Sequence, residues 1–139
     1  MKSENLEKLA PFVLRLALSG VYLWFGVSQL VSSKMWVGMV PPWASGLFGF
    51  SSTNIVQMNG AFEVVAGTLL ALGFLVRPVA ALLSVHLLVI AADLGLNAIG
   101  VRDFGLGFAT LAIALSGQDD YSVWPAKKEA MPPQPGQIQ

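Results

Sequence analysis

Four stretches of the sequence are apolar over the length that a helix needs to cross a lipid bilayer. They lie at residues 12–30, 55–75, 79–96 and 104–115. A bilayer core of about 30 Å requires a helix of about 20 predominantly apolar residues. The fourth stretch is short, and we expect it to gain a turn from Arg102 and Asp103 at its start and Ser116 at its end. The chain is therefore predicted to be all-α, a bundle of four transmembrane helices.

The composition agrees with a membrane protein. Of the 139 residues, 55% are hydrophobic and 12% are charged, and the mean hydropathy is +0.66. Soluble domains carry about twice this charged fraction, and a chain of this size has too much surface to hide so many apolar side chains. The zero net charge and lack of a basic run argue against a nucleic-acid partner. The absence of cysteine excludes disulfides, thiolate metal sites and thiol catalysis within the chain.

Three regions are expected along the chain. They are a cytoplasmic N-terminal segment (1–11), a four-helix transmembrane domain (12–117) and a cytoplasmic, partly disordered tail (118–139). The aromatic residues of the connection at 31–53 predict an interfacial or re-entrant segment between the first two helices. Pro78 suits the first turn of the third helix, and Asp103 suits the first turn of the fourth, where a carboxylate favours the helix dipole.

The distribution of Lys and Arg predicts that both termini are cytoplasmic. Two cations, Lys34 and Arg102, fall on the opposite side. Those on the side of the termini are Lys2, Lys8, Arg15, Arg77, Lys127 and Lys128. We interpret Arg15 as a side chain that snorkels to the interface and Arg77 as a topology determinant. The position of Arg15 within the apolar region, with no clear cleavage site after it, argues against a cleaved signal peptide over residues 1–20.

Polar side chains within the predicted spans mark a candidate site, since ionisable groups at membrane depth usually face the bundle interior with a partner. They gather in the outer half of the bundle: Gln29, Asn59, Glu63, His86, Asp93, Asn97, Arg102 and Asp103. Structural roles are the alternative for several of them. Asn59, Asn97 and His86 could form interhelical hydrogen bonds, with a ligand or proton-relay role as the other reading of His86. Glu63 and Asp93 could form an ion pair with Arg102.

Glu63 and Asp93 are predicted to lie close together. The tight turn at Arg77 and Pro78 makes the second and third helices antiparallel neighbours. At a rise of about 1.5 Å per residue, Glu63 lies about 18 Å and Asp93 about 21 Å from the cytoplasmic ends of their spans. We therefore expect Glu63 to face Asp93 and Arg102 across a buried polar site.

Three segments resemble the DoxX family of small bacterial membrane proteins. They are "RLALSGVYLWFGVSQL", "NGAFEVVAGTLLALGFLVRPVAALL" and "RDFGLGFATLAIALSG", in this order. The spacing of Glu63 and Arg77 and the Arg102–Asp103 opening of the last helix are similar to that family's pattern, over residues 12–117. The resemblance implies a four-helix, multi-pass protein of the bacterial inner membrane. Relatives often carry a lysine where this chain has Gln29, so a cation is missing from the predicted cluster.

The resemblance also implies a function. The family takes its name from a subunit of a thiosulfate:quinone oxidoreductase, and some relatives assemble with soluble redox enzymes. A membrane subunit of a quinone-linked oxidoreductase is the favoured reading, with quinone held among Glu63, Asp93, Asn97, Arg102 and Asp103. The chain itself would hold no redox cofactor, so electrons would require a redox partner protein.

Two other functions stay open, and with them the question of whether the chain is an enzyme. One is a non-catalytic membrane anchor or assembly factor, in which segment 31–53 docks a partner protein and the polar cluster stabilises the bundle. The other is a small-solute or proton carrier, since intramembrane acids often line such paths. Four helices are few for alternating access, so a carrier would require a homo-oligomer.

Overall fold

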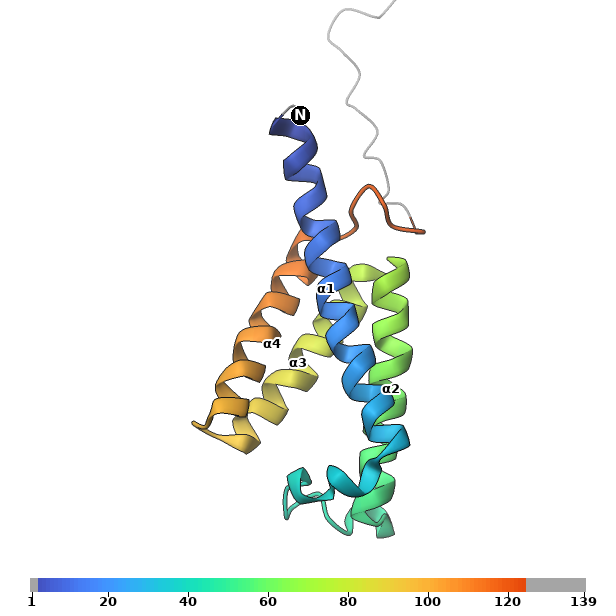
Figure 1. Ribbon diagram of the computed structural model, residues 1–139, viewed down its shortest axis with the longest axis vertical. Helices are drawn as coiled ribbons and strands as arrows, with labels where there is room; N and C mark the ends of the chain where they lie inside the picture. The colour runs from blue at the N-terminus through green and yellow to red at the C-terminus, as the bar shows by residue number, and fades with distance from the viewer. Residues whose placement is uncertain (1–2, 125–139) are drawn as a thin grey trace, which may run out of the picture.

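All the long regular elements of the protein are α-helices. The computed structural model describes residues 3–124, except for the side chains of residues 3–5 and 47. The long helices are α1 (Ser3–Val31), α2 (Ser52–Leu72), α3 (Val76–Leu94) and α4 (Ala98–Ser116). Each is long and apolar enough to cross a membrane. The predicted fold class is therefore confirmed (Figure 1).

The helices associate as two pairs. α1 packs along α2 and α3 packs along α4, whereas α2 meets α3 and α1 meets α4 much less extensively. The pairs lie together at the end where the chain begins and diverge toward the opposite end (Figure 1). We call these the termini end, which holds the turn at 73–75 and residues 118–124, and the loop end, which holds residues 32–51 and the turn at 95–97.

Capping side chains determine where two of the helices begin. The Ser51 hydroxyl accepts from the Asn54 N–H at 3.2 Å and starts α2. The Asn97 side-chain oxygen accepts from the N–H groups of Ile99 and Gly100 at 3.0 and 2.9 Å. α4 therefore begins at Ala98, upstream of the start that was expected at Arg102. The expected place of Asp103 in the first turn is wrong, because this cap starts the helix earlier.

The other helix limits differ from the apolar runs in simpler ways. α1 begins upstream of residue 12, at Ser3, and includes Pro11. α2 ends at Leu72, and the next residue, Gly73, has a left-handed φ of 72° that suits a glycine C-cap. α3 begins at Val76, so Pro78 lies in its first turn as predicted.

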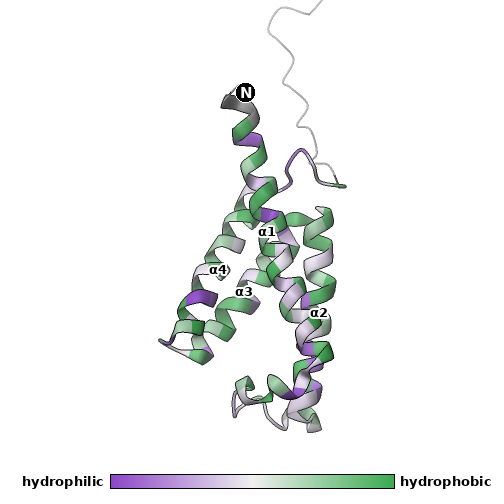
Figure 2. Ribbon diagram, viewed as in Figure 1, coloured by the Kyte–Doolittle hydropathy of each residue, from purple (hydrophilic) through white to green (hydrophobic). Residues whose placement is uncertain are grey.

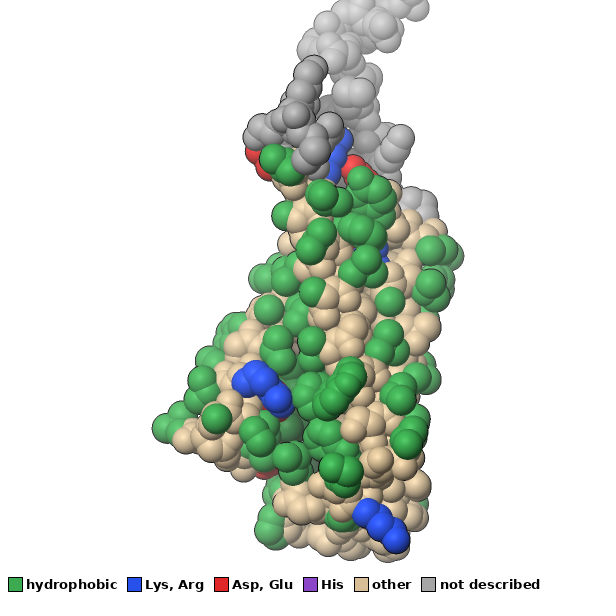
Figure 3. Space-filling view, viewed as in Figure 1, with side chains coloured by type: hydrophobic (Ala, Val, Ile, Leu, Met, Phe, Trp, Pro, Cys, Tyr) green, Lys and Arg blue, Asp and Glu red, His purple; other side chains and the backbone are tan. Residues whose placement is uncertain are grey.

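The core lies where the two helix pairs meet. Leu70, Val76 and Leu83 are fully buried, and Leu18 and Ile113 are nearly so. Large apolar side chains also point outward, and the exposed fraction reaches 63% for Trp24 and 74% for Leu115. Hydrophobic side chains cover much of the face shown in Figure 3, and the helices are apolar along most of their length (Figure 2). Apolar side chains therefore lie both in the core and on the surface, as expected for a protein that is surrounded by lipid.

A glycine contact brings α1 and α2 together at the loop end. A Cβ added to Gly26 would lie 2.8 Å from the Gly60 carbonyl oxygen, and one on Gly60 would lie 2.8 Å from that of Gly26. No real Cβ tolerates such a distance, so the two backbones approach this closely because both residues are glycine.

The predicted aromatic segment folds across the loop end. It contains three short 3₁₀ helices, η1 (Ser33–Met35), η2 (Val37–Met39) and η3 (Leu47–Gly49). Trp36, between η1 and η2, donates from Nε1 to the Ser28 hydroxyl at 3.2 Å and meets the Phe25 ring edge-on at 5.5 Å. We call residues 32–51 the lid, because they lie below the diverging ends of the helix pairs (Figure 1).

Candidate functional site

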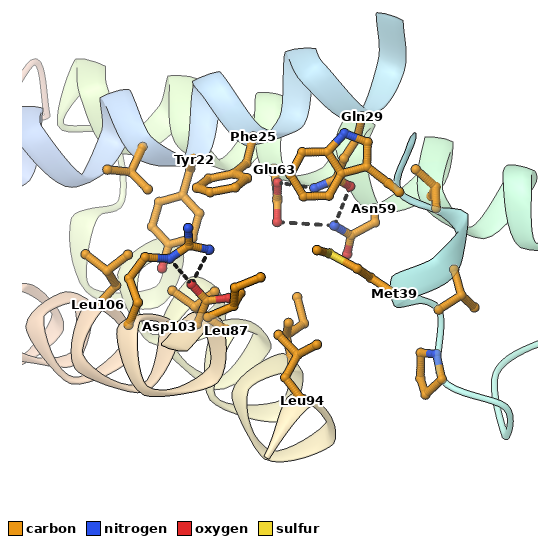
Figure 4. Close-up of a pocket in the computed structure, with 18 of the residues that line it drawn as sticks. Tyr22, Phe25, Gln29, Met39, Asn59, Glu63, Leu87, Leu94, Asp103 and Leu106 are labelled. Carbon is orange, nitrogen blue, oxygen red and sulfur yellow. Dashed lines mark hydrogen bonds and ion pairs between the residues drawn. The ribbon is translucent and has the colours of Figure 1, made fainter. Parts of the chain in front are cut away.

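A cavity of about 150 Å³ lies between the two helix pairs at the loop end (Figure 4). All four long helices and the lid contribute to its lining. Most of the lining side chains are aliphatic or aromatic. The polar side chains that line it are Tyr22, Gln29, Asn59, Glu63, Arg102 and Asp103. An apolar cavity with a few convergent polar groups is the usual form of a small-molecule site.

Glu63 occupies one wall of this cavity, and its side chain is only 5% exposed. Gln29 donates from Nε2 to Oε2 of Glu63 at 3.0 Å. Asn59, one turn away on α2, donates from Nδ2 to Oε1 of Glu63 at 3.2 Å and to Oε1 of Gln29 at 2.7 Å. Both carboxyl oxygens therefore accept from an amide (Figure 4). The amides satisfy a carboxyl group that would otherwise be costly to bury.

His86 meets Glu63 from outside the cavity. Its Nε2 lies 3.4 Å from Oε1 of Glu63, and its ring packs edge-on against Phe62 at 4.8 Å between centroids. The contact joins α2 to α3. A protonated His86 would place a cation beside this carboxyl group, whereas Gln29 is a neutral neighbour.

Arg102 and Asp103 form the polar part of the α4 wall. Nη2 of Arg102 lies 2.8 Å from Oδ1 of Asp103, and Nε donates to the same oxygen at 2.8 Å. The Asp103 side chain is 7% exposed and that of Arg102 is 45% exposed. The guanidinium also lies over the Phe25 ring, with its carbon 4.9 Å from the centroid. Within residues 3–124, the ion pair of Arg102 is with Asp103, so the expected pair with Glu63 or Asp93 is not formed.

Besides His86, two further predicted site residues lie outside the cavity lining. Asp93 is exposed and accepts from Nε1 of Trp43 in the lid at 3.1 Å. Asn97 is also exposed and caps α4. The cavity is lined from α3 by Leu87, Ile90 and Leu94. Asp93 is turned away from Leu94 by about 100° around the helix, so its height along the axis does not bring it to the cavity.

Tyr22 and Thr110 form a buried pair that the sequence reasoning missed. Their hydroxyl groups lie 3.0 Å apart, and each also donates to a backbone carbonyl, Thr110 to that of Leu106 at 2.8 Å and Tyr22 to that of Leu83 at 3.4 Å. Tyr22 also lines the cavity. The spacing of Arg15, Ser19, Tyr22 and Gln29 places these polar residues on one face of α1, which was the available signal.

The predicted snorkelling of Arg15 is wrong. Its side chain is 1% exposed, and its Nε lies 2.7 Å from Oδ2 of Asp119, whose side chain is 2% exposed. Nη1 of Arg15 also donates to the carbonyl oxygens of Leu70 and Ala71 at the end of α2. Arg15 turns inward because these acceptors compensate its charge.

Asp119 is held by several donors beyond the end of α4. The Tyr121 N–H and the Ser122 hydroxyl donate to its Oδ1 at 3.0 and 3.2 Å. Burial acts to raise the pKa of Asp119, but the hydrogen bond and charge of Arg15, with the Tyr121 and Ser122 donors, outweigh burial and lower the pKa. Residues 118–124 are thus attached to the termini end. The rest of the expected tail, 125–139, lies outside the described residues.

The fold defines a multi-pass integral membrane protein, whose four long helices and lid line a largely apolar cavity with a few polar side chains. The chain belongs to the DoxX family, whose family model matches residues 10–95. Searches of curated proteins and of solved structures found no match. Among residues 3–124, no group of three His, Asp or Glu side chains is arranged to hold a metal ion.

Proposed function

We propose that this DoxX-family protein is the membrane subunit of a quinone-linked oxidoreductase complex and that its cavity binds the quinone head group. One observation carries the proposal: the carboxyl groups of Glu63 and Asp103 lie on opposite walls of an otherwise largely apolar cavity (Figure 4). A quinone ring has an apolar face and polar oxygen atoms on opposite edges. The cavity offers matching contacts in the same arrangement.

The size of the cavity fits one ring. A cavity of roughly 150 Å³ lined by aliphatic and aromatic side chains can bind benzene, and this cavity has about that volume. The aromatic rings of Phe25 and Trp36 and the side chain of Met39 are among its apolar lining. A ring bound here is therefore surrounded by apolar side chains, with its polar edges toward α2 and α4.

The polar residues have separate roles in this proposal. Glu63 accepts a proton from a quinol hydroxyl or returns one to a quinone oxygen, and His86 is the neighbouring group that exchanges this proton. Arg102 donates a hydrogen bond to the ring oxygen near α4 and polarises it. Tyr22 and Thr110 form the boundary of the site on the side that faces the core. Electrons pass between the quinone and a redox partner protein.

Tryptophan fluorescence tests the binding step. Trp36 lines the cavity, and a quinone bound beside it should quench its emission. We expect a tailed benzoquinone to quench the protein saturably in lipid nanodiscs. Trp36→Phe, which keeps the other three of the four tryptophans, should lose most of the saturable component. Glu63→Ala should weaken binding by about tenfold or more, since it removes a buried polar partner. Quenching that never saturates would contradict the proposal.

The proposal includes a location. The protein lies in the bacterial inner membrane with both termini in the cytoplasm, so the loop end and its cavity belong to the outer half of the bilayer. The quinone would then be bound near the outer surface, and protons released from a quinol would leave on that side.

A non-catalytic anchor is the second candidate. It is favoured by the aromatic side chains that the lid exposes, with exposed fractions of 61% for Trp43 and 87% for Phe48. Co-purification with native membrane proteins separates the two functions. If the chain is an anchor, Phe48→Ser should release the partner and Glu63→Gln should leave the activity of the complex intact. A quinone-binding subunit should lose activity in Glu63→Gln with the partner still bound.

A further inference from the structure

The cavity is closed within each helix pair by close packing at glycine residues. α1 and α2 are joined by the Gly26–Gly60 approach described above. α3 and α4 are joined at Gly107, where an added Cβ would lie 2.8 Å from the Leu88 side chain. The Ser84 hydroxyl donates to the Gly107 carbonyl at 2.9 Å. A ligand cannot pass through either pair without separating packed helices.

The wall between α2 and α3 is closed by polar and aromatic contacts. Glu63 and His86 meet there at 3.4 Å, and the Phe62 ring covers His86. The turn at 73–75 also connects these two helices directly, and its Gly73 and Phe74 N–H groups bond to the carbonyls of Leu70 and Leu69 at the end of α2.

The two ends of the cavity are also restrained. Toward the core, Tyr22 joins α1 to α4 through Thr110. At the loop end, the lid is bonded to α1 by Trp36 and Ser28 and to α3 by Trp43 and Asp93. Breaking the loop end open requires loss of both tryptophan hydrogen bonds.

The wall between α1 and α4 is different, because the side chain that closes it, Arg102, is flexible and half-exposed. Phe25 and Arg102 meet there, and both line the cavity. Val21 and Leu106, each one turn deeper on its helix, line it as well. The Arg102 side chain is 45% exposed, and the surface is hollowed between these helices in Figure 3. Rotation of one arginine about its flexible stem would widen this opening with both helices in place.

We propose that the ligand enters the cavity sideways from the bilayer, between α1 and α4, and that the Phe25–Arg102 contact is the gate. The inference rests on the proposed function and specifies its substrate class. The ligand is a lipid-dissolved molecule with a ring-sized polar head and a hydrocarbon tail. The cavity has room for the head, and the tail stays between the helices and the lipid, past Val21 and Leu106.

Arg102 suits a gate at this place. It lies at the second turn of α4, about 6 Å from the start of the helix, where an arginine can reach the lipid head groups. Its Nε and Nη2 face Asp103, and its carbon lies above Phe25. An arriving polar head can replace the Phe25 contact with a hydrogen bond while the ion pair with Asp103 is kept.

Cross-linking tests the route, since the chain has no cysteine of its own. Phe25→Cys with Arg102→Cys allows a short bis-methanethiosulfonate reagent to join α1 to α4 across the gate. Val21→Cys with Leu106→Cys does the same one turn deeper and retains the Arg102–Asp103 pair. Trp43→Cys with Asp93→Cys is the matched control, because it joins the lid to α3 and neither residue lines the cavity. Each variant is measured in nanodiscs before cross-linking, after it, and after reduction of the link.

The readout is the rate at which a tailed benzoquinone quenches Trp36. We expect either α1–α4 link to slow quenching by about tenfold or more, and reduction to restore it. The lid–α3 link should leave the rate within about twofold. An unchanged rate in both α1–α4 links, with intact binding, would overturn the lateral route and leave the proposed function standing. Blocking by the lid link would likewise overturn it. Absence of saturable quenching in every variant before cross-linking would overturn the proposed function and the inference together.

Discussion

Arg15 of α1 and Asp119, three residues past the end of α4, form a buried ion pair with 2.7 Å between Nε and Oδ2. The pair attaches the C-terminal end of the bundle to its first helix. The same arginine binds carbonyl groups at the end of α2, so one side chain connects three helices. Two ring contacts also hold residues 118–124 against this end, Phe12 with Tyr121 and Phe74 with Trp124.

Asp119→Ala should strongly destabilise the protein. It leaves Arg15 buried without its counter-charge, and removing one partner of a buried pair costs about 3–5 kcal/mol. Thermal unfolding in detergent measures the loss. Asp120→Ala is the matched control, because Asp120 is exposed and its contact with Lys8 spans 3.7 Å. Similar unfolding temperatures for the two variants would contradict a stabilising role of the pair.

The stability provided by Asp119 should depend on pH in the acid range. Its folded pKa is lower than the ordinary value of 3.8. A lowered folded pKa means that the contribution is complete above the unfolded pKa and is lost as pH falls through the folded pKa. The difference in unfolding temperature between the wild type and Asp119→Asn should therefore be constant near neutrality and shrink below about pH 4. If the difference in unfolding temperature persists at the lowest pH, Asp119 stabilises the protein through the shape of its side chain and not through its charge.

Alanine at Gly26 or Gly60 should force α1 and α2 apart. The added methyl group would lie 2.8 Å from a backbone oxygen, and overpacking of this kind costs about 1–3 kcal/mol. Gly20→Ala and Gly105→Ala are controls, since an added Cβ there has nothing within 4 Å. We expect the first two variants to unfold at lower temperature and to bind quinone more weakly, because Gly60 also packs against Gln29. Equal effects at all four positions would contradict the close approach.

These relationships differ in how far the sequence predicted them. The four helices follow from the length of the apolar runs, because a bilayer sets that length. The contact of Asn59 with Glu63 follows from the helical period, because residues one turn apart lie on one face. The height of Asp93 was estimated from helix rise, but its direction around the axis depends on how α3 packs against α4. Arg15 and Asp119 are 104 residues apart, and Asp119 follows the apolar run. No local pattern could therefore connect them.

The orientation of the bundle is a separate prediction. Reporter fusions after residue 45 should be active outside the cytoplasm, while fusions after residue 77 and after residue 125 should be active inside. The physical reason is the excess of Lys and Arg on the side of the termini. The opposite pattern would place the cavity in the inner half of the bilayer. The proposed release of protons at the outer surface would then be wrong.

Arg102→Ala should destabilise the bundle because it leaves Asp103 buried without a cation. The Asp103 side chain is 7% exposed, and its carboxylate is paired to Arg102 at 2.8 Å. Since Arg102 itself is 45% exposed, the loss should fall between the values for surface and buried pairs, at about 1–3 kcal/mol. The double variant Arg102→Ala, Asp103→Asn should recover most of this stability, because it removes the unpaired charge as well. Thermal unfolding of the two single variants and the double variant in detergent gives the coupling between the residues. If the double variant is no more stable than Arg102→Ala, the loss comes from the missing Phe25 contact, and the carboxylate of Asp103 does not need Arg102.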